Sequence, residues 1–206
     1  YQEEIRCGYT VTEKTKRVWA VQLAMLDEVE RICRKYGLRY FADSGTLIGA
    51  VRHGGYIPWD DDIDLVMLRE DYDKFLTVAQ KELAALAELP EYLSLQTVYR
   101  EKNYLRGHAQ LRDSRTTGCN EEDKRAGYNC GIFIDIFPLD NVPEGRLRAR
   151  FWAAQIKLAW MVLYSWYRFD YYENATAAGK LLNKIGNFAS VPMEKAYGLY
   201  EKICRR

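Results

Sequence analysis

The alternation of apolar and polar positions divides the first third of the chain into short elements. Apolar residues recur every three or four positions over residues 12–35, which predicts an amphipathic helix that ends at Gly37. Residues 38–45 open with apolar and aromatic side chains and predict a short strand leading into a turn. TLIGAV at residues 46–51 predicts a short helix, and the glycines and proline within residues 54–58 predict a loop.

The middle of the chain predicts strands that carry acidic residues. DIDLVM at residues 62–67 predicts a strand that opens with carboxylates and continues into apolar positions, and residues 71–87 predict a helix. Residues 92–100 and 105–112 predict the two strands of a hairpin. GIFIDIFPLD at residues 131–140 alternates isoleucine with Phe and Asp, which predicts a further strand.

The last third predicts helices after a polar loop at residues 113–129. Residues 147–169 are rich in Trp and Tyr and predict a helix, and a break around Gly179 separates it from a second one. These patterns favour an α+β fold, in which helices pack on a small sheet that carries the acidic residues. We expect a core over residues 1–140 and a helical C-terminal region over residues 141–206 packed on it.

The composition is that of a folded chain without a global charge. Of the 206 residues, 48% are hydrophobic and 14% aromatic, so the chain can bury one substantial core. The formal net charge of +1 gives no reason to expect nucleic acid as a partner, and any phosphate site must be local. The five cysteines include no CxxC pair, which favours reduced thiols in the cytosol.

No segment of the sequence predicts a transmembrane helix. The most apolar stretch, residues 158–167, is about half the length that spans a bilayer. We expect a buried helix here, with an interfacial helix as the alternative. The expected location is cytoplasmic, with peripheral contact to the inner face of the membrane left open. The sequence opens at Tyr1 instead of Met, so its ends are not taken as native boundaries.

Asp62 and Asp64 are the strongest candidates for a catalytic centre. Residues two apart on a strand point to the same face, so their carboxylates would project together from Cα atoms roughly 7 Å apart. Such a pair repels unless a cation lies between, and oxygen ligands of this kind suit Mg²⁺ or Mn²⁺. These ions can hold the attacking and leaving oxygens of a phosphoryl transfer. Asp60 could add a further ligand.

Two other interpretations of the acidic run were weighed. DDDID could be an acidic surface loop, but the apolar LVM follows directly and ties the carboxylates to an element with a buried face. Asp60, Asp62 and Asp64 also match the first three ligands of an EF-hand. That site requires Gly at the sixth position and Glu at the twelfth, where this chain has Leu65 and Asp71.

Asp135 is the third candidate ligand, because it stands within an apolar strand. A lone carboxylate in such surroundings is costly unless it is paired or binds a metal. The alternative is an edge strand with Asp135 facing solvent. His108 lies near Arg106 and Arg112 in the sequence, and we expect a solvated position for it without a role in the site.

Residues before the acidic run suit a phosphate and an organic cation. Ser44 and Gly45 can present backbone N–H groups at the start of a short helix, where the helix dipole favours an anion. Arg52 and His53 could each bind a phosphate oxygen. Trp59 could stack on a base or hold a quaternary ammonium by cation–π attraction, with core packing as the alternative.

Two blocks of the sequence resemble the LicD family of phosphocholine transferases, to which the fukutin-type proteins are related. DSGTLIGAVRHGGYIPWDDDIDLVMLREDYDKF at residues 43–75 resembles the family signature, and residues 131–140 resemble its second block. The resemblance implies a nucleotidyltransferase-like fold with a central mixed sheet. It also implies that the metal ligands are Asp62, Asp64 and Asp135, and that the nucleotide-phosphate side comprises Ser44, Gly45, Arg52 and His53.

The function implied by this resemblance is a phosphotransfer. Members of the family move phosphocholine, or a similar alcohol phosphate, from a CDP-activated donor such as CDP-choline to a sugar hydroxyl of a lipopolysaccharide, teichoic acid or other surface polysaccharide. The alternatives are a nucleotidyltransferase that releases pyrophosphate and a non-catalytic family member that binds glycan. A glycosyltransferase with a DxD site is disfavoured, because the single strand before the acidic run is too short for a Rossmann-like half.

Overall fold

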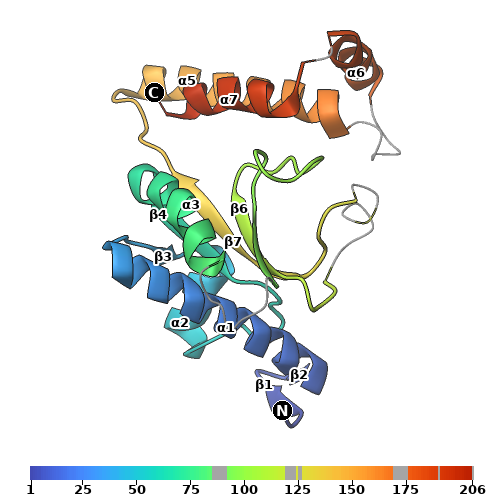
Figure 1. Ribbon diagram of the computed structural model, residues 1–206. Coiled ribbons are helices and arrows are strands. Elements are labelled where there is room, and N and C mark those ends of the chain that lie inside the picture. Colours follow the sequence, from blue (N-terminus) through green and yellow to red (C-terminus); the bar gives the residue numbers. More distant parts are fainter. Residues whose placement is uncertain (85–91, 119–123, 125–126, 169–175, 190, 206) are drawn as a thin grey trace. The chain divides into compact units, whose positions relative to one another are not determined.

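The protein is described by a computed structural model that separates into two compact units (Figure 1). The described residues are 1–84, 92–118, 124, 127–168, 176–189 and 191–205. The first unit is formed by residues 1–96, 107–120 and 129–139. The second unit is formed by residues 97–106, 121–128 and 140–206. The combination of helices with a mixed sheet confirms the predicted α+β class.

The first unit is built on a five-stranded sheet of order β3-β4-β7-β6-β5. Its strands are β3 (Phe41–Ala42), β4 (Asp64–Leu68), β5 (Leu93–Gln96), β6 (Ala109–Asp113) and β7 (Ile132–Leu139). β4 and β7 pair in parallel and the other neighbours are antiparallel, so the sheet is mixed. β5 and β6 pair in antiparallel fashion as predicted, but β5 ends at Gln96 and not at residue 100, and β6 begins at Ala109 and not at residue 105. β7 lies between β4 and β6, so the alternative of an edge strand around Asp135 is wrong.

Three helices and a small hairpin complete this unit. They are α1 (Glu13–Tyr36), α2 (Ser44–His53), α3 (Arg69–Ala84), and the strands β1 (Glu4–Arg6) and β2 (Tyr9–Val11). The side chain of Thr12 accepts a hydrogen bond from the Thr15 N–H and caps α1, while Gly37 ends it in the left-handed conformation. The helix predicted over residues 12–35 is therefore confirmed.

The core of this unit lies between the sheet and helices α1 and α3, which cover the same face (Figure 1). Alternate residues of the central strands point to that core, among them Leu65 and Met67 of β4 and Ile134 and Ile136 of β7. The residues between them therefore face the opposite side. This alternation places Asp135 on the face of the sheet that α1 and α3 do not cover.

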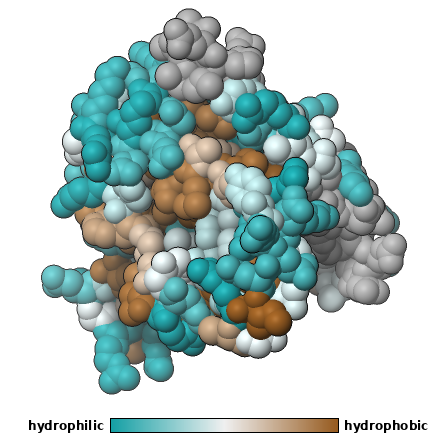
Figure 2. Space-filling model, turned by 90° about the horizontal axis from the view of Figure 1, so that it is seen from below, coloured by the Kyte–Doolittle hydropathy of each residue, from teal (hydrophilic) through white to brown (hydrophobic). Residues whose placement is uncertain are grey.

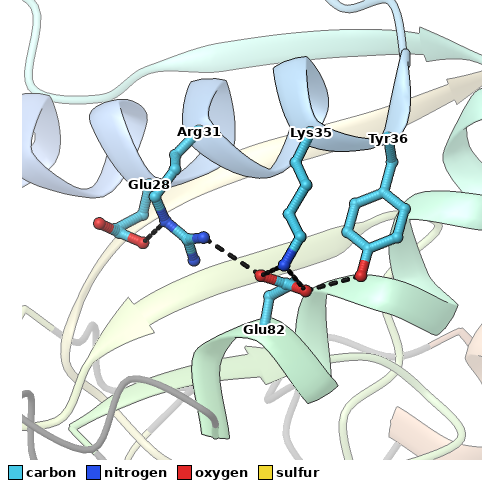
Figure 3. Close-up of polar contacts among 5 residues, drawn as sticks. All are labelled: Glu28, Arg31, Lys35, Tyr36 and Glu82. Carbon is cyan, nitrogen blue, oxygen red and sulfur yellow. Dashed lines mark hydrogen bonds and ion pairs between the residues drawn. The ribbon is translucent and has the colours of Figure 1, made fainter.

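An ion cluster around Glu82 ties α1 to α3 (Figure 3). The Glu82 carboxylate of α3 accepts hydrogen bonds from Lys35 Nζ at 2.8 Å and Tyr36 Oη at 2.6 Å, and lies 3.1 Å from Arg31 Nη1. Glu28 binds the same guanidinium from within α1. The hydrogen bonds from Lys35 and Tyr36 lower the pKa of Glu82 to about 2, so this side chain remains an anion at any ordinary pH.

Several predicted boundaries in this unit were wrong. β4 begins at Asp64 and not at residue 62. β3 comprises only Phe41–Ala42, and α2 begins at Ser44, two residues before the predicted helix. The end of the helix predicted over residues 71–87 lies partly outside the described residues.

The second unit is helical and has its own core. Within the described residues, its helices include α5 (Arg146–Arg168), α6 (Ala177–Ala189) and α7 (Met193–Cys204). Val98 and Leu105 pack with Leu163 of α5 and Tyr197 of α7. The predicted break around Gly179 was wrong, because this residue lies inside α6.

Exposed apolar side chains occur among hydrophilic ones. The face shown in Figure 2 has separate apolar patches within a largely hydrophilic surface. Across the described residues, no helix combines the length and the apolar character needed to cross a bilayer.

Candidate active site

Three carboxylates converge at the start of β4 and the middle of β7. Asp64 is the first residue of β4 and pairs in register with Asp135 of the adjacent parallel strand. Asp62 lies in the loop before β4, yet its carboxylate oxygen lies within 4.8 Å of those of both other residues. Asp60, Asp61 and Asp62 satisfy the same criterion as a second group. The structure thus brings together the three acidic residues that the sequence singled out.

Side chains of α1 bind the backbone of the acidic loop, residues 60–62. Trp19 Nε1 donates to the carbonyl of Asp60 at 2.9 Å, and Gln22 Nε2 donates to that of Asp61 at 2.7 Å. Tyr56 stacks on Trp19, with ring centroids 4.6 Å apart, and donates its hydroxyl to Gln22 Oε1. These contacts occupy the carbonyl groups of the loop and leave its carboxylates to face one another.

Asp135 is held by Gln110 of β6 and by His108, the residue that directly precedes β6. Gln110 Nε2 donates to Asp135 Oδ1 at 2.7 Å, and His108 Nε2 lies 2.8 Å from the same oxygen. Arg112, which is fully buried, donates to Gln110 Oε1 at 2.7 Å, and the His108 ring lies 4.2 Å from that of Phe137. Asp135 is therefore anchored at Oδ1 by side chains on the same face of the sheet.

The expectation of a solvated position for His108 was wrong, since its side chain is only 14% exposed and contacts Asp135. The sequence signal for the position of His108 is its spacing from Gln110 and Arg112. The three residues follow one another two positions apart, which places them on one face of an extended chain.

Burial and neighbouring negative charges raise the pKa of Asp62 and of Asp64. Burial, followed by the negative charges of Asp64 and Asp60, raises the pKa of Asp62 to about 7. Burial and the charge of Asp135 raise that of Asp64 to about 6. Burial also raises the pKa of Asp60. Oxygen ligands of this kind fit a divalent cation such as Mg²⁺ or Mn²⁺, because its charge offsets both their mutual repulsion and the cost of burying them as anions.

The N-terminus of α2 lies beside the acidic residues. The Asp43 N–H donates to the carbonyl of Asp64, and the Asp64 N–H donates to Thr46 Oγ1 at 2.9 Å. The Asp60 carboxylate lies so close to the Cα of Gly45 that a Cβ at this position would collide with Oδ2. A glycine is therefore required there for the carboxylate to approach.

The residues expected on the phosphate side fall at opposite ends of α2. Ser44 is its first residue, whereas Arg52 and His53 end it, about 12 Å away at 1.5 Å per residue. Arg52 Nε donates to His53 Nε2 at 3.0 Å. The His53 and Tyr9 rings lie edge-on to Trp59, with centroids 6.0 and 6.1 Å away. Trp59 is 53% exposed, so it is not a core residue.

Comparison with known sequences identifies the family of this chain. The sequence profile described as "LicD/FKTN/FKRP, nucleotidyltransferase domain" matches residues 37–142, which include Asp62, Asp64 and Asp135. The chain belongs to this LicD family. Relatives include the lipopolysaccharide cholinephosphotransferase LicD of Haemophilus influenzae, 31% identical over 188 residues, which are 85% of this chain and 63% of that protein.

A second named relative matches over a shorter stretch. The ribitol 5-phosphate transferase FKRP of Homo sapiens is 54% identical over 35 residues, which are 17% of this chain and 7% of that protein. The LicD-family chain described here therefore spans less than two thirds of the length of either named relative.

Proposed function

We propose that this chain catalyses the metal-dependent transfer of phosphocholine, or of a similar alcohol phosphate, from a CDP-activated donor to a sugar hydroxyl of a cell-surface glycan. The convergence of Asp62, Asp64 and Asp135 carries the proposal. The printed names of two relatives support it, because cholinephosphotransferase and ribitol 5-phosphate transferase both denote transfer of an alcohol phosphate.

In the proposed mechanism the chain binds the metal and positions the donor. Asp62, Asp64 and Asp135 would hold the ion, and His108 and Gln110 would keep Asp135 in place. Bound Mg²⁺ or Mn²⁺ supplies neutralisation of the charge on the phosphoryl oxygens. The backbone N–H groups at the N-terminus of α2 are suited to bind the donor phosphates, because the helix dipole favours anions there.

The proposed reaction exchanges one phosphorus–oxygen bond for another. The acceptor hydroxyl oxygen bonds to the phosphorus that bears choline, and the bond from this phosphorus to the bridging oxygen breaks. CMP leaves with that oxygen and the electron pair. The hydroxyl proton passes to a carboxylate of the site, for which Asp60 and Asp135 are the candidates.

Calorimetric titration with CDP-choline in the presence of Mg²⁺ or Mn²⁺ tests the donor and the metal together. Binding should require the metal and disappear in the Asp62→Asn, Asp64→Asn double variant. Asp27→Asn is the matched control, because Asp27 is exposed on α1 and belongs to neither group of converging carboxylates. Undiminished binding by the double variant, or binding without metal, would contradict the proposed site.

The alcohol and the leaving group are tested by two further measurements. If the cluster of Trp59, Tyr9 and His53 holds the choline, Trp59→Ala should weaken the binding of CDP-choline but not that of CMP. If Trp59 stacks on the base, the substitution should weaken the binding of both.

Product analysis with a glycan acceptor should yield CMP. Release of pyrophosphate from a nucleoside triphosphate would instead establish a nucleotidyltransferase, as the description of the family profile allows.

A further inference from the structure

An apolar stripe runs along the outer face of α5. Leu147, Phe151, Ala154, Leu158 and Met161 follow one another at alternating steps of four and three residues, which places them on one side of a helix. All five are exposed, and the exposed fractions of Leu147 and Phe151 are 82% and 68%. At 1.5 Å per residue the stripe is about 21 Å long.

The opposite side of α5 is already occupied within the second unit. Leu163 is buried with Tyr197, and Trp152 Nε1 donates to the carbonyl of Ile203 at 2.7 Å. The stripe is therefore additional to the face that forms the core of this unit.

A row of cations borders the stripe. Arg146, Arg150 and Lys157 are all exposed and each directly precedes a stripe residue, so the three lie about 100° from it around the helix. The sequence of α5 contains no Asp or Glu. Long Lys and Arg side chains can extend from such positions while their stems cover apolar surface.

Helix α6, which contacts α5, carries the same pattern on a smaller scale. Leu181 and Ile185 are 60% and 47% exposed and one turn apart, and the exposed Lys180 and Lys184 directly precede them. α6 also contains no acidic residue. Two neighbouring helices thus combine exposed aliphatic side chains with adjoining cations.

We propose that α5 and α6 bind the surface of an anionic lipid bilayer, with the apolar stripe in the interface and the cations against the headgroups. Helices of this composition lie in the plane of a membrane, with the apolar face several ångströms deep. Anionic lipids attract such cations. A second copy of the chain fits the face less well, because pairing through the stripe would bring the cationic rows together without acidic partners on α5 or α6.

Co-sedimentation of the full chain with vesicles tests this surface independently of any transfer activity. The chain should bind vesicles of phosphatidylcholine and phosphatidylglycerol, bind pure phosphatidylcholine far more weakly, and be released by salt. We expect a triple variant, Arg146→Gln, Arg150→Gln and Lys157→Gln, to bind anionic vesicles about a hundredfold more weakly, because each cation contributes about fivefold to the affinity. The Leu147→Ser, Phe151→Ser double variant should also lose binding.

Two control variants change comparable residues elsewhere. Ile5→Ser removes an apolar side chain that is 76% exposed, and Lys14→Gln removes an exposed cation of α1, and both should bind like the unaltered chain. Thermal melting checks that each variant is folded. Failure of the unaltered chain to bind anionic vesicles, or full binding by the folded stripe and cation variants, overturns the proposal. Dimerisation that the stripe variant abolishes, without vesicle binding, overturns it in favour of an interface between copies.

Discussion

At the residue scale, the raised pKa values of Asp62 and Asp64 make the site a source of instability without a metal. Folding raises these pKa values from 3.8 to about 7 and about 6, so between about pH 4 and 7 the folded state binds more protons than the unfolded state. Stability contributed by the protonated forms is then lost as the pH rises through that window. A divalent cation reverses this, because it binds the deprotonated carboxylates.

We expect urea unfolding without metal to show a free energy of unfolding that falls as the pH rises from 5 to about 7.5. Mg²⁺ should raise this free energy more at the higher pH, by about 2.7 kcal/mol when its concentration is 100 times the dissociation constant. The Asp62→Asn, Asp64→Asn double variant should show a flatter dependence and little response to Mg²⁺. An equal response to Mg²⁺ in this variant would place the metal elsewhere.

The residues of the site were predictable from the sequence to different degrees. Asp135 could be singled out because a carboxylate within an apolar strand requires a partner. Its pairing with Asp64 depends on two segments about 70 residues apart lying side by side, which local periodicity does not encode. The contact of His108 with Asp135 was missed for the same reason, since it follows from the position of β6 beside β7.

At the element scale, the packing of α1 on α3 depends on a charged group whose partners all lie on the other helix. Glu82 has a pKa lowered to about 2, from 4.5, by its hydrogen bonds from Lys35 and Tyr36. The stability that it contributes is therefore complete above about pH 4.5 and is lost as the pH falls toward 2.

Glu82→Gln should lower the urea midpoint at pH 7 and remove part of the loss of stability between pH 4.5 and 2, because the amide cannot accept the same charge-assisted bonds. Chemical denaturation across this range measures both effects. Glu30→Gln is the matched control, since Glu30 pairs with Arg34 on the surface of α1 and should change little. Equal effects of the two substitutions would refute a special role for the cluster around Glu82.

The elements themselves were predictable where periodicity is long and capping residues are present. α1 has both, with Thr12 at its start and Gly37 at its end. The start of β4 was misplaced by two residues. The loop before it is held by Trp19 and Gln22, and these contacts with residues about 40 positions away leave no local signal. The β1 and β2 hairpin was missed, since three-residue strands are too short for alternation to be recognised.

At the scale of the whole molecule, the two units do not follow one another along the chain. Residues 97–106 leave the sheet after β5, join the helical unit, and return before β6. Their side chains Val98 and Leu105 are buried with Leu163 of α5 and Tyr197 of α7. A sequence pattern could predict the strands on either side of this segment but not the unit in which it packs.

A chain ended after Asp140 should therefore fail to form a compact fold over residues 97–106. Removing α5 and α7 leaves Val98 and Leu105 without the residues that cover them, so the fragment should bind a hydrophobic dye and melt with lower cooperativity than the full chain. In the full chain, Leu163→Ala should lower the free energy of unfolding by about 2–5 kcal/mol. Leu158→Ala, at an exposed position of the same helix, should lower it far less. If the fragment melts as sharply as the full chain and binds no dye, residues 1–140 form an independent domain and the segment 97–106 does not need the helices to stay folded.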